Sequence, residues 1–562
     1  MNGLEVHRKE LLSLYPSWSE MTLYRRFEMT AKDCQGKMFL IDGSRRYSYG
    51  EMKQLVDRAA EALKLLGVKM GDCVAVMMSN RLEFIYLTFA IAKLGAVKVP
   101  VNRSAGFDEV RYILSQTESH IMILEDTKQW EKLNSLCMEH HFIGLDLLPQ
   151  EELEKLVSWQ KIFCQEMPEQ EEASVDDAQA VSDIIYTSGS TGQPKGVMLT
   201  HDMLLRSAFA NCMNRGFERG RRLYVPLPLF HVYGYVEGLL AVLFVGGSIV
   251  ISHGKFDAEQ AVKTMEESQA NDILSVPTIM MKILLLPSLD NYNLNALQAV
   301  YCSASVCPKW VWSGIRTRLK VSEITTGYGM TEVSGASMQT DPLDSDEVQS
   351  GRVGKILDGG CAGIQTKENQ IIEYRVLDQE TGLDLPDAIY GELVCRGPIV
   401  MKGYYKNPEA NAHTFTKDGW MKTGDIGYRD AAGYYKYLGR CNDMYKVNGE
   451  NVSPQFLDKV ISKCEDVISV ESVGVPNERF GWIGVAFVDA DNPNKEKQKR
   501  IVGFCKERLA PYQMPKYFFF LNGSELPHTS TGKVQKFKLR KLAEEMISKQ
   551  EVNEITKYEV NI

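Results

Sequence analysis

A stretch of glycine and small hydroxyl residues has the composition of a phosphate-binding loop. The β-branched run that starts at Ile184 leads into TSGSTGQPKG, which ends in Lys195 and Gly196. Glycines let backbone N–H groups curl around an anion, while hydroxyls add donors and a lysine adds a mobile positive charge. Pro194 precedes the lysine and Gly196 follows it, so the stretch does not fit the Walker A pattern. It predicts a phosphate loop of another kind.

Further motifs accompany this loop along the chain. They are LPLFHVYG (227–234), TGYGMTE (326–332), GELVCRGP (391–398), GYYKNPEA (403–410), GWMKTGD (419–425), GRCNDMYKVNGENVSP (439–454) and TSTGKV (529–534). In this order they resemble the motifs of the adenylate-forming superfamily of AMP-dependent synthetases and ligases, which includes acyl-CoA synthetases, adenylation domains of peptide synthetases, and luciferases. The resemblance implies that a carboxylate attacks the α-phosphorus of ATP, giving an acyl-adenylate and pyrophosphate.

The resemblance assigns the phosphate and metal contacts to particular residues. Two anions must meet in this reaction, so positive charge is needed where negative charge accumulates. Lys195 is expected to hold the β- and γ-phosphates, and Glu332 to hold Mg²⁺, which prefers hard oxygen ligands. Thr187 is expected as a second metal contributor, and Thr331 as a contributor at the phosphates. The loop residues expected to contact ATP are Ser188, Gly189, Ser190, Thr191 and Gly192.

The nucleoside contacts are implied in the same way. Tyr328 is expected to lie against the adenine ring and Asp425 to accept from the ribose hydroxyls. Arg440 is expected to add a fork-shaped contact to the same nucleotide. Ser305 and Val306 are expected at the adenine site, although they stand where the family usually has alanine and proline. The neighbouring residues expected to contact the nucleotide are Gly327, Gly329 and Met330.

The C-terminal motifs imply a small domain that presents two different faces to the active site. Lys533 would bridge the α-phosphate and the substrate carboxylate during adenylation. After a rotation of this domain, Lys446 and Gly449 would line the tunnel for pantetheine, because glycine lets a thin ligand approach the backbone closely. Asn442 is expected near the hinge, since asparagine tolerates unusual backbone angles. The basic run KVQKFKLRKL that follows is interpreted as solvated.

Family members differ in what attacks the adenylate. A thiol is a good nucleophile towards a mixed anhydride, so we expect transfer to coenzyme A with release of acyl-CoA and AMP. A stand-alone adenylation enzyme that loads the pantetheine arm of a carrier protein is the alternative, and a luciferase-like oxidation ranks third. A non-catalytic nucleotide sensor is disfavoured because both Lys195 and Lys533 are present.

The acid substrate is indicated by the segment FHVYG. Amino-acid-activating relatives place an aspartate in this region to pair with the substrate ammonium, and this chain has none there. A buried ammonium without a partner is costly, so a fatty or aromatic acid is favoured over an amino acid. His231 resembles the family's gate between the ATP and acyl sites, although a structural histidine explains the residue equally well.

Composition narrows the class of protein further. The chain has 562 residues, 44% hydrophobic residues and a net charge of −9, which suits a globular enzyme better than a nucleic-acid binder. Its twelve cysteines include no CxxC pair, which is typical of a reducing compartment. The most apolar stretch, LLAVLFVGGSIVI (239–251), is too short to span a bilayer and predicts a core helix followed by a buried strand. We expect a cytoplasmic protein.

The elements that must position these residues follow from hydrophobic periodicity. Apolar runs such as CVAVMMS and AVKVPV alternate with amphipathic stretches such as EMKQLVDRAAEALKLLG, a pattern that favours mostly parallel sheets covered by helices. We therefore predict an α/β fold with a large N-terminal domain of layered sheets (1–440) for ATP and acid. A small mobile α+β domain (441–562) is expected to carry the catalytic lysine and to contain helices at PQFLDKVISKC and KEKQKRIVGFCKERL.

Overall fold

The computed structural model describes residues 3–138, 140–146, 156–164, 176–187, 193–305, 307–441, 443–447, 450–477, 480–490, 493–521, 523–528, 534–548 and 557–560. Several predicted residues lie outside the described residues: Ser188, Gly189, Ser190, Thr191, Gly192, Val306, Asn442, Gly449 and Lys533.

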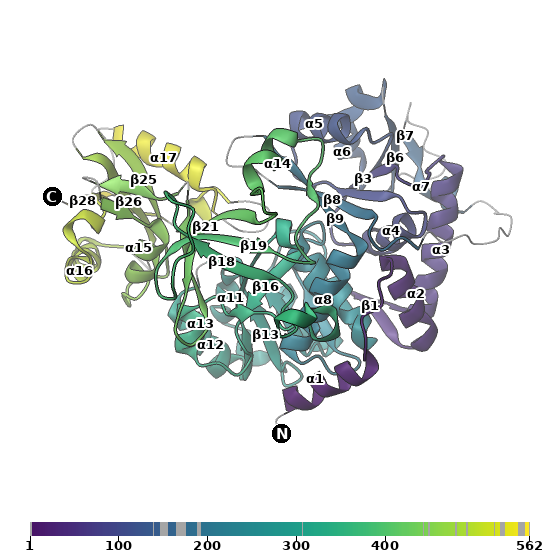
Figure 1. Cartoon of the computed structure of the whole chain (residues 1–562), viewed down its shortest axis with the longest axis horizontal. Helices are drawn as coiled ribbons and strands as arrows, with labels where there is room; N and C mark the ends of the chain where they lie inside the picture. The colour runs from purple at the N-terminus through teal and green to yellow at the C-terminus, as the bar shows by residue number, and fades with distance from the viewer. Residues whose placement is uncertain are drawn as a thin grey trace.

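Two mostly parallel sheets form the centre of the molecule (Figure 1). The first runs in the order β20 (Gly403–Tyr404), β9 (Lys195–Thr200), β8 (Val181–Thr187), β4 (Val97–Pro100), β3 (Cys73–Met77), β5 (Ile121–Leu124), β6 (His141–Gly144) and β7 (Leu156–Ser158). The second runs in the order β14 (Glu323–Thr325), β13 (Ala299–Cys302), β12 (Asp272–Ser275), β10 (Arg222–Val225), β11 (Ser248–Ile251), β1 (Met38–Asp42) and β2 (Arg45–Ser48). The predicted α/β class is confirmed.

Helices cover these sheets as the sequence pattern indicates. The predicted helix at EMKQLVDRAAEALKLLG is α3 (Tyr49–Leu65), which Ser48 caps and which packs against α4 (Leu82–Lys93). The other helices around the sheets are α1 (Gly3–Leu14), α2 (Leu23–Asp33), α5 (Phe107–Thr117), α6 (Thr127–Leu133), α7 (Trp159–Phe163), α8 (His201–Arg215), α10 (Ala258–Ser268), α11 (Pro277–Leu284), α12 (Lys309–Arg318) and α13 (Asp346–Gly351). No helix among the described residues is long and apolar enough to cross a membrane.

The apolar stretch after FHVYG contains an unusual helix. A short α9 (Val232–Gly234) continues into a π-helix, η2 (Tyr235–Leu240), and then into a 3₁₀ segment, η3 (Ala241–Val245), before strand β11. The predicted core helix followed by a buried strand is therefore present. π-Helical turns are rare and frequently occur at functional sites. This one lies beside α8 and β16.

Antiparallel strands complete the larger part of the chain. One sheet consists of β15 (Gly327–Met330), β16 (Gly335–Gln339) and β17 (Lys355–Ile356). Another consists of β18 (Glu373–Leu377), β19 (Gly391–Arg396), β21 (Met421–Arg429) and β22 (Tyr435–Arg440), and α14 (Pro408–Thr414) precedes β21.

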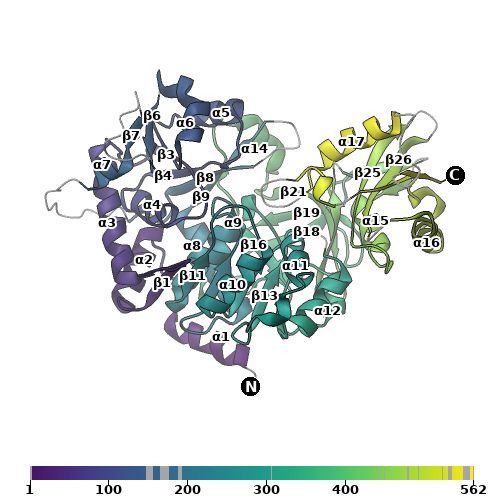
Figure 2. The ribbon, with the colours of Figure 1, turned by 180° about the vertical axis from the view of Figure 1, so that it is seen from behind.

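The C-terminal part forms its own sheet, to one side of the rest in both views (Figures 1 and 2). Its strands are β23 (Tyr445–Val447), β24 (Glu450–Val452), β25 (Ser469–Asn477), β26 (Gly481–Asp489), β27 (Tyr517–Phe520) and β28 (Lys557–Glu559), with helices α15 (Pro454–Ile461), α16 (Lys495–Lys506) and α17 (Lys536–Ser548). Both predicted helices are present as α15 and α16. The domain boundary at residue 440 stays a prediction.

Candidate active site

The predicted phosphate loop is held at both ends by paired strands. Thr187 ends β8 and lies opposite Lys195, the first residue of the antiparallel strand β9. The β-branched residues of β8 favour the strand, and Pro194 directly precedes β9. The hairpin therefore fixes two predicted residues directly at the base of the loop.

Lys195 and Glu332 meet through a tyrosine that the sequence analysis did not select. The Lys195 Nζ lies 5.0 Å from the centroid of the Tyr404 ring, and the Tyr404 hydroxyl donates to Glu332 Oε1 at 2.9 Å. Burial and the neighbouring Glu332 charge both raise the pKa of Tyr404, so it stays a donor. Tyr404 belongs to the quoted motif GYYKNPEA, which is the signal that could have found it.

Three predicted nucleotide residues form a second cluster. The Tyr328 hydroxyl donates to Asp425 Oδ2 at 2.6 Å, and Arg440 Nε lies 3.2 Å from Asp425 Oδ1. Asp425 and Arg440 are direct neighbours across β21 and β22, which explains their meeting. The Asp425 side chain is 3% exposed and that of Arg440 is 53% exposed. The carboxylate of Asp425 raises the pKa of Arg440, and the charge of Glu332 adds to the effect.

Because the charge of Glu332 in the first cluster acts on Arg440 in the second, the two clusters lie near one another. Burial is the main cause that raises the pKa of Tyr328, and the Asp425 charge acts in the same direction. Strand β15 carries Tyr328 and approaches β16 very closely, because a Cβ on Gly329 would lie 2.0 Å from the carbonyl oxygen of Gly335. Glycine is therefore required there for packing within the hairpin. The predicted residues Gly327, Gly329 and Met330 all belong to this hairpin, and Thr331 directly follows it.

The remaining predicted residues are spread over other elements. His231 precedes α9 and its ring centroid lies 4.6 Å from that of Phe230. Ser305 is exposed after strand β13. Lys446 is exposed on β23 of the C-terminal sheet. Their predicted roles stay predictions.

A buried ion pair joins strands β4 and β8. Lys98 Nζ is 3.2 Å from Asp183 Oδ1, donates to Thr88 Oγ1 at 3.0 Å, and lies 3.7 Å from the centroid of the Tyr235 ring. Asp183 Oδ2 accepts from Ser182 Oγ at 2.8 Å and from the Tyr235 hydroxyl at 3.3 Å. We name these five residues the Lys98 cluster. It ties strands β4 and β8 to the π-helix, and its only sequence signal is a lysine inside the apolar run AVKVPV.

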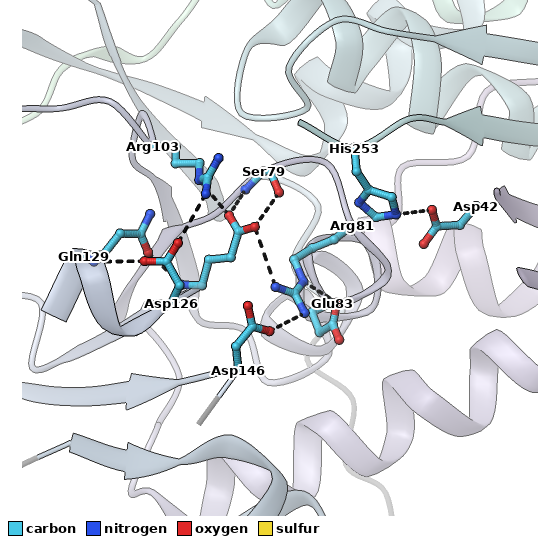
Figure 3. A network of polar contacts seen from close by, with 10 residues as sticks. Asp42, Ser79, Arg81, Glu83, Arg103, Asp126, Gln129, Asp146 and His253 are labelled. Carbon is cyan, nitrogen blue, oxygen red and sulfur yellow. Dashed lines mark hydrogen bonds and ion pairs between the residues drawn. The ribbon is translucent and has the colours of Figure 1, made fainter. Parts of the chain in front are cut away.

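Figure 3 shows a further network, at the carboxyl ends of neighbouring parallel strands. Arg81 lies 3.0 Å from Asp146, and Arg103 lies 3.0 Å from Glu125, which also accepts from Ser79 at 2.9 Å. These residues follow β3, β4, β5 and β6. The contacts join the ends of four strands, and both arginines are paired with carboxylates.

Comparison with known proteins identifies the class of this fold and site. The chain belongs to the AMP-binding enzyme family, whose model matches residues 27–405, and the model of the AMP-binding enzyme C-terminal domain matches residues 457–533. The resemblance inferred from the motifs is thereby confirmed.

Similar proteins and structures cover nearly the whole chain. The 2-succinylbenzoate--CoA ligase of Bacillus licheniformis is 30% identical over 94% of this chain and 100% of its own length. The mitochondrial medium-chain acyl-CoA ligase ACSF2 of Danio rerio is 29% identical over 92% of this chain and 86% of its own. The crystal structure of the anthranilate CoA ligase AuaEII with anthranoyl-AMP has a TM-score of 0.85 at 25% identity, covering 94% and 99% of the two chains.

Proposed function

We propose that this protein activates a carboxylic acid with ATP to an acyl-adenylate and transfers the acyl group to coenzyme A, releasing AMP and pyrophosphate. The observation that carries the proposal is the pair of adjoining clusters, Lys195–Tyr404–Glu332 and Tyr328–Asp425–Arg440. They offer charge for phosphates and a buried carboxylate for a ribose within a chain of the AMP-binding enzyme family. The relatives' names as CoA ligases support coenzyme A as the acceptor.

The residues present fit a magnesium ion held mainly by the nucleotide. Among the described residues no group of three or more acidic, histidine or cysteine side chains could hold a metal by itself. Glu332 offers a carboxylate beside Lys195, and Thr187 offers a hydroxyl at the base of the loop. Mg²⁺ characteristically takes one or two protein oxygens and completes its shell with phosphates and water. Bound there, it would neutralise phosphate charge during adenylation.

The second step would use the other face of the C-terminal domain. Lys533 on one face would serve adenylation, and Lys446 with Gly449 on the other would admit pantetheine, as residues 441–562 move against residues 1–440. A carrier protein is the alternative acceptor, and a cytoplasmic location remains a prediction.

The decisive experiment follows pyrophosphate release from ATP and Mg²⁺ with a panel of fatty, aromatic and amino acids, with and without coenzyme A. We expect release with a fatty or aromatic acid and acyl-CoA formation only when coenzyme A is present. A Lys533→Ala variant should lose adenylation but keep thioester formation from a supplied acyl-adenylate, whereas Gly449→Leu should do the reverse. If no acid released pyrophosphate, the proposed function would be wrong.

A further inference from the structure

Three buried polar side chains gather between α8, the π-helix η2 and strand β16. Ser207 and Asn211 lie one turn apart on α8, and Glu237 lies on η2. Their exposed fractions are 1%, 0% and 2%. We name them the Glu237 cluster. Figure 2 shows α8, α9 and β16 side by side, and the contacts between α8, η2 and β16 agree with this view.

Each of these side chains has a polar atom without a hydrogen-bond partner among the described residues: Ser207 Oγ, Asn211 Nδ2 and Glu237 Oε2. The other carboxyl oxygen, Glu237 Oε1, accepts from the backbone N–H of Ala336 at 2.7 Å. Leaving a buried donor or acceptor unsatisfied costs about 1–3 kcal/mol per group. Three such groups in one place therefore point to a polar molecule that completes them.

Nearby polar groups do not remove this deficit. Tyr301, Asn211 and Arg215 act to lower the pKa of Glu237, but burial outweighs them and raises that pKa to about 8. The side chain is therefore protonated at neutral pH. A protonated carboxyl can donate one hydrogen bond and accept others, which suits a neutral partner such as a hydroxyl or an aromatic amine.

The cluster lies directly behind elements of the candidate active site. A Cβ on Gly335 would lie 3.1 Å from Glu237 Oε1 and 3.5 Å from Ser207 Oγ, so this glycine packs against the cluster and a side chain there would crowd it. Gly335 belongs to β16, which pairs with the strand that carries Tyr328. On the other side, η2 begins shortly after His231, the predicted gate to the acyl site. The cluster thus lies between the hairpin expected at the nucleotide and the helix that follows the segment expected to gate the acyl site.

We propose that the Glu237 cluster binds a hydroxyl or amino group on the acyl part of the substrate, so that the preferred acid is a hydroxylated or amino-substituted one. This inference rests on the proposed acid activation. Because Oε1 accepts from Ala336, the proton of the neutral carboxyl lies on Oε2. The substrate group would therefore accept from Glu237 Oε2 and Asn211 Nδ2 and donate to Ser207 Oγ. Apart from Tyr235, whose hydroxyl contacts Asp183, the other residues of η2 are apolar or glycine, which suits the fatty or aromatic skeleton favoured by the sequence.

The test compares kcat/KM for pyrophosphate release between matched acids. Benzoate is compared with all its monohydroxy and monoamino isomers, and octanoate with its monohydroxy isomers. Sites built to hydrogen-bond a substrate group discriminate strongly against analogues that lack it, so at least one substituted acid should exceed its parent by about tenfold or more. The ratio of substituted to parent acid should collapse in Ser207→Ala and in Glu237→Leu.

Controls separate a binding role from a structural one. Ser268→Ala removes another buried helix hydroxyl, on α10, and should leave the ratio unchanged. Glu237→Gln keeps an acceptor for the Ala336 N–H and a donor in place of the carboxyl O–H, so it should keep the ratio that Glu237→Leu loses. If kcat/KM for each parent acid equalled that for every substituted acid, the proposal would be wrong and the cluster would hold a water molecule instead. If no acid turned over, the proposed function would fail. The increase in melting temperature with each acid would then still show whether the substituted acid binds better than its parent.

Discussion

Tyr235 and Glu237 lie two positions apart on the same π-helical turn, yet they belong to buried polar clusters of opposite kinds. In the Lys98 cluster the ammonium contacts a carboxylate, a hydroxyl and a ring, and every contact comes from the protein. In the Glu237 cluster three polar atoms lack a partner among the described residues.

The difference separates a structural site from a binding site. A buried charge is tolerated when its partners are built in, and such a pair then fixes the elements that carry it. The Lys98 cluster thus positions strand β8, which leads into the phosphate loop, relative to η2. A buried site left incomplete loses stability in the absence of its ligand and gains it on binding. Both clusters contact the π-helix η2. The Lys98 cluster holds it at all times, whereas the Glu237 cluster is expected to hold it more firmly when the substrate is bound.

The largest expected effect comes from breaking the complete cluster. Lys98→Met leaves the fully buried Asp183 carboxylate without its counter-charge, which should lower the free energy of unfolding by about 3–5 kcal/mol. Urea denaturation measures the loss. The double variant Lys98→Met/Asp183→Leu serves as the control, because removing both charges should restore much of the stability. A single variant as stable as the parent protein would show that this ion pair does not stabilise the fold.

The next effect is a pH dependence that arises beside the same cluster. His201 is buried, accepts the backbone N–H of Leu23 at Nδ1, and burial lowers its pKa to about 4. The unfolded chain binds a proton near pH 6.5 and the folded chain near pH 4, so stability should fall as the pH drops through this window. The loss approaches about 3 kcal/mol. His201→Gln should flatten the dependence in denaturation curves recorded between pH 7 and 4, and an unchanged slope would refute the assignment.

A third buried polar site, at Asp425, combines the two kinds of partner, because both protein groups and a ligand are expected to contact it. Its two carboxyl oxygens contact Tyr328 and Arg440, and the ribose hydroxyls of the nucleotide are expected to share this carboxylate. Asp425→Ala should weaken ATP binding by one to two decades, since a hydrogen bond to a charged group contributes about 1.5–3 kcal/mol. Calorimetric titration measures the affinity. Tyr328→Phe is the matched control and should weaken binding less, because the carboxylate and Arg440 remain. Unchanged affinity with a normal melting curve would contradict the ribose role.

The sequence predicts the elements and motifs that depend on local residue patterns. It does not predict side-chain contacts between residues far apart in the chain. Alternating periodicity predicted the layered sheets and the helices α15 and α16, and motif order predicted the family. The sequence predicts a solvated run KVQKFKLRKL, and Lys538 and Lys541 are exposed. Lys536, the first residue of α17, is the exception among the described lysines of the run, because it contacts Asp458 at 3.2 Å and Glu471. No local pattern marks a lysine whose partners lie over sixty positions away, and the same holds for Glu237, which depends on α8 and β16.

The smallest expected effect tests the incomplete cluster in the absence of a ligand. At pH 4 the carboxyl of Glu237 is protonated in the folded chain and largely protonated in the unfolded chain. It then resembles glutamine in shape, so Glu237→Gln should change the free energy of unfolding at pH 4 by no more than about 0.5 kcal/mol. The difference in stability between the two proteins should grow at higher pH. The folded-state pKa of about 8 lies above the unfolded value of about 4.5, so the parent protein loses stability as the pH rises from about 4.5 to about 8, whereas the amide does not titrate. The variant should therefore become the more stable protein at pH 9 in parallel urea titrations. A large loss of stability in the variant at pH 4 would mean that Glu237 is already ionised and paired, and the contrast with the Lys98 cluster would then disappear.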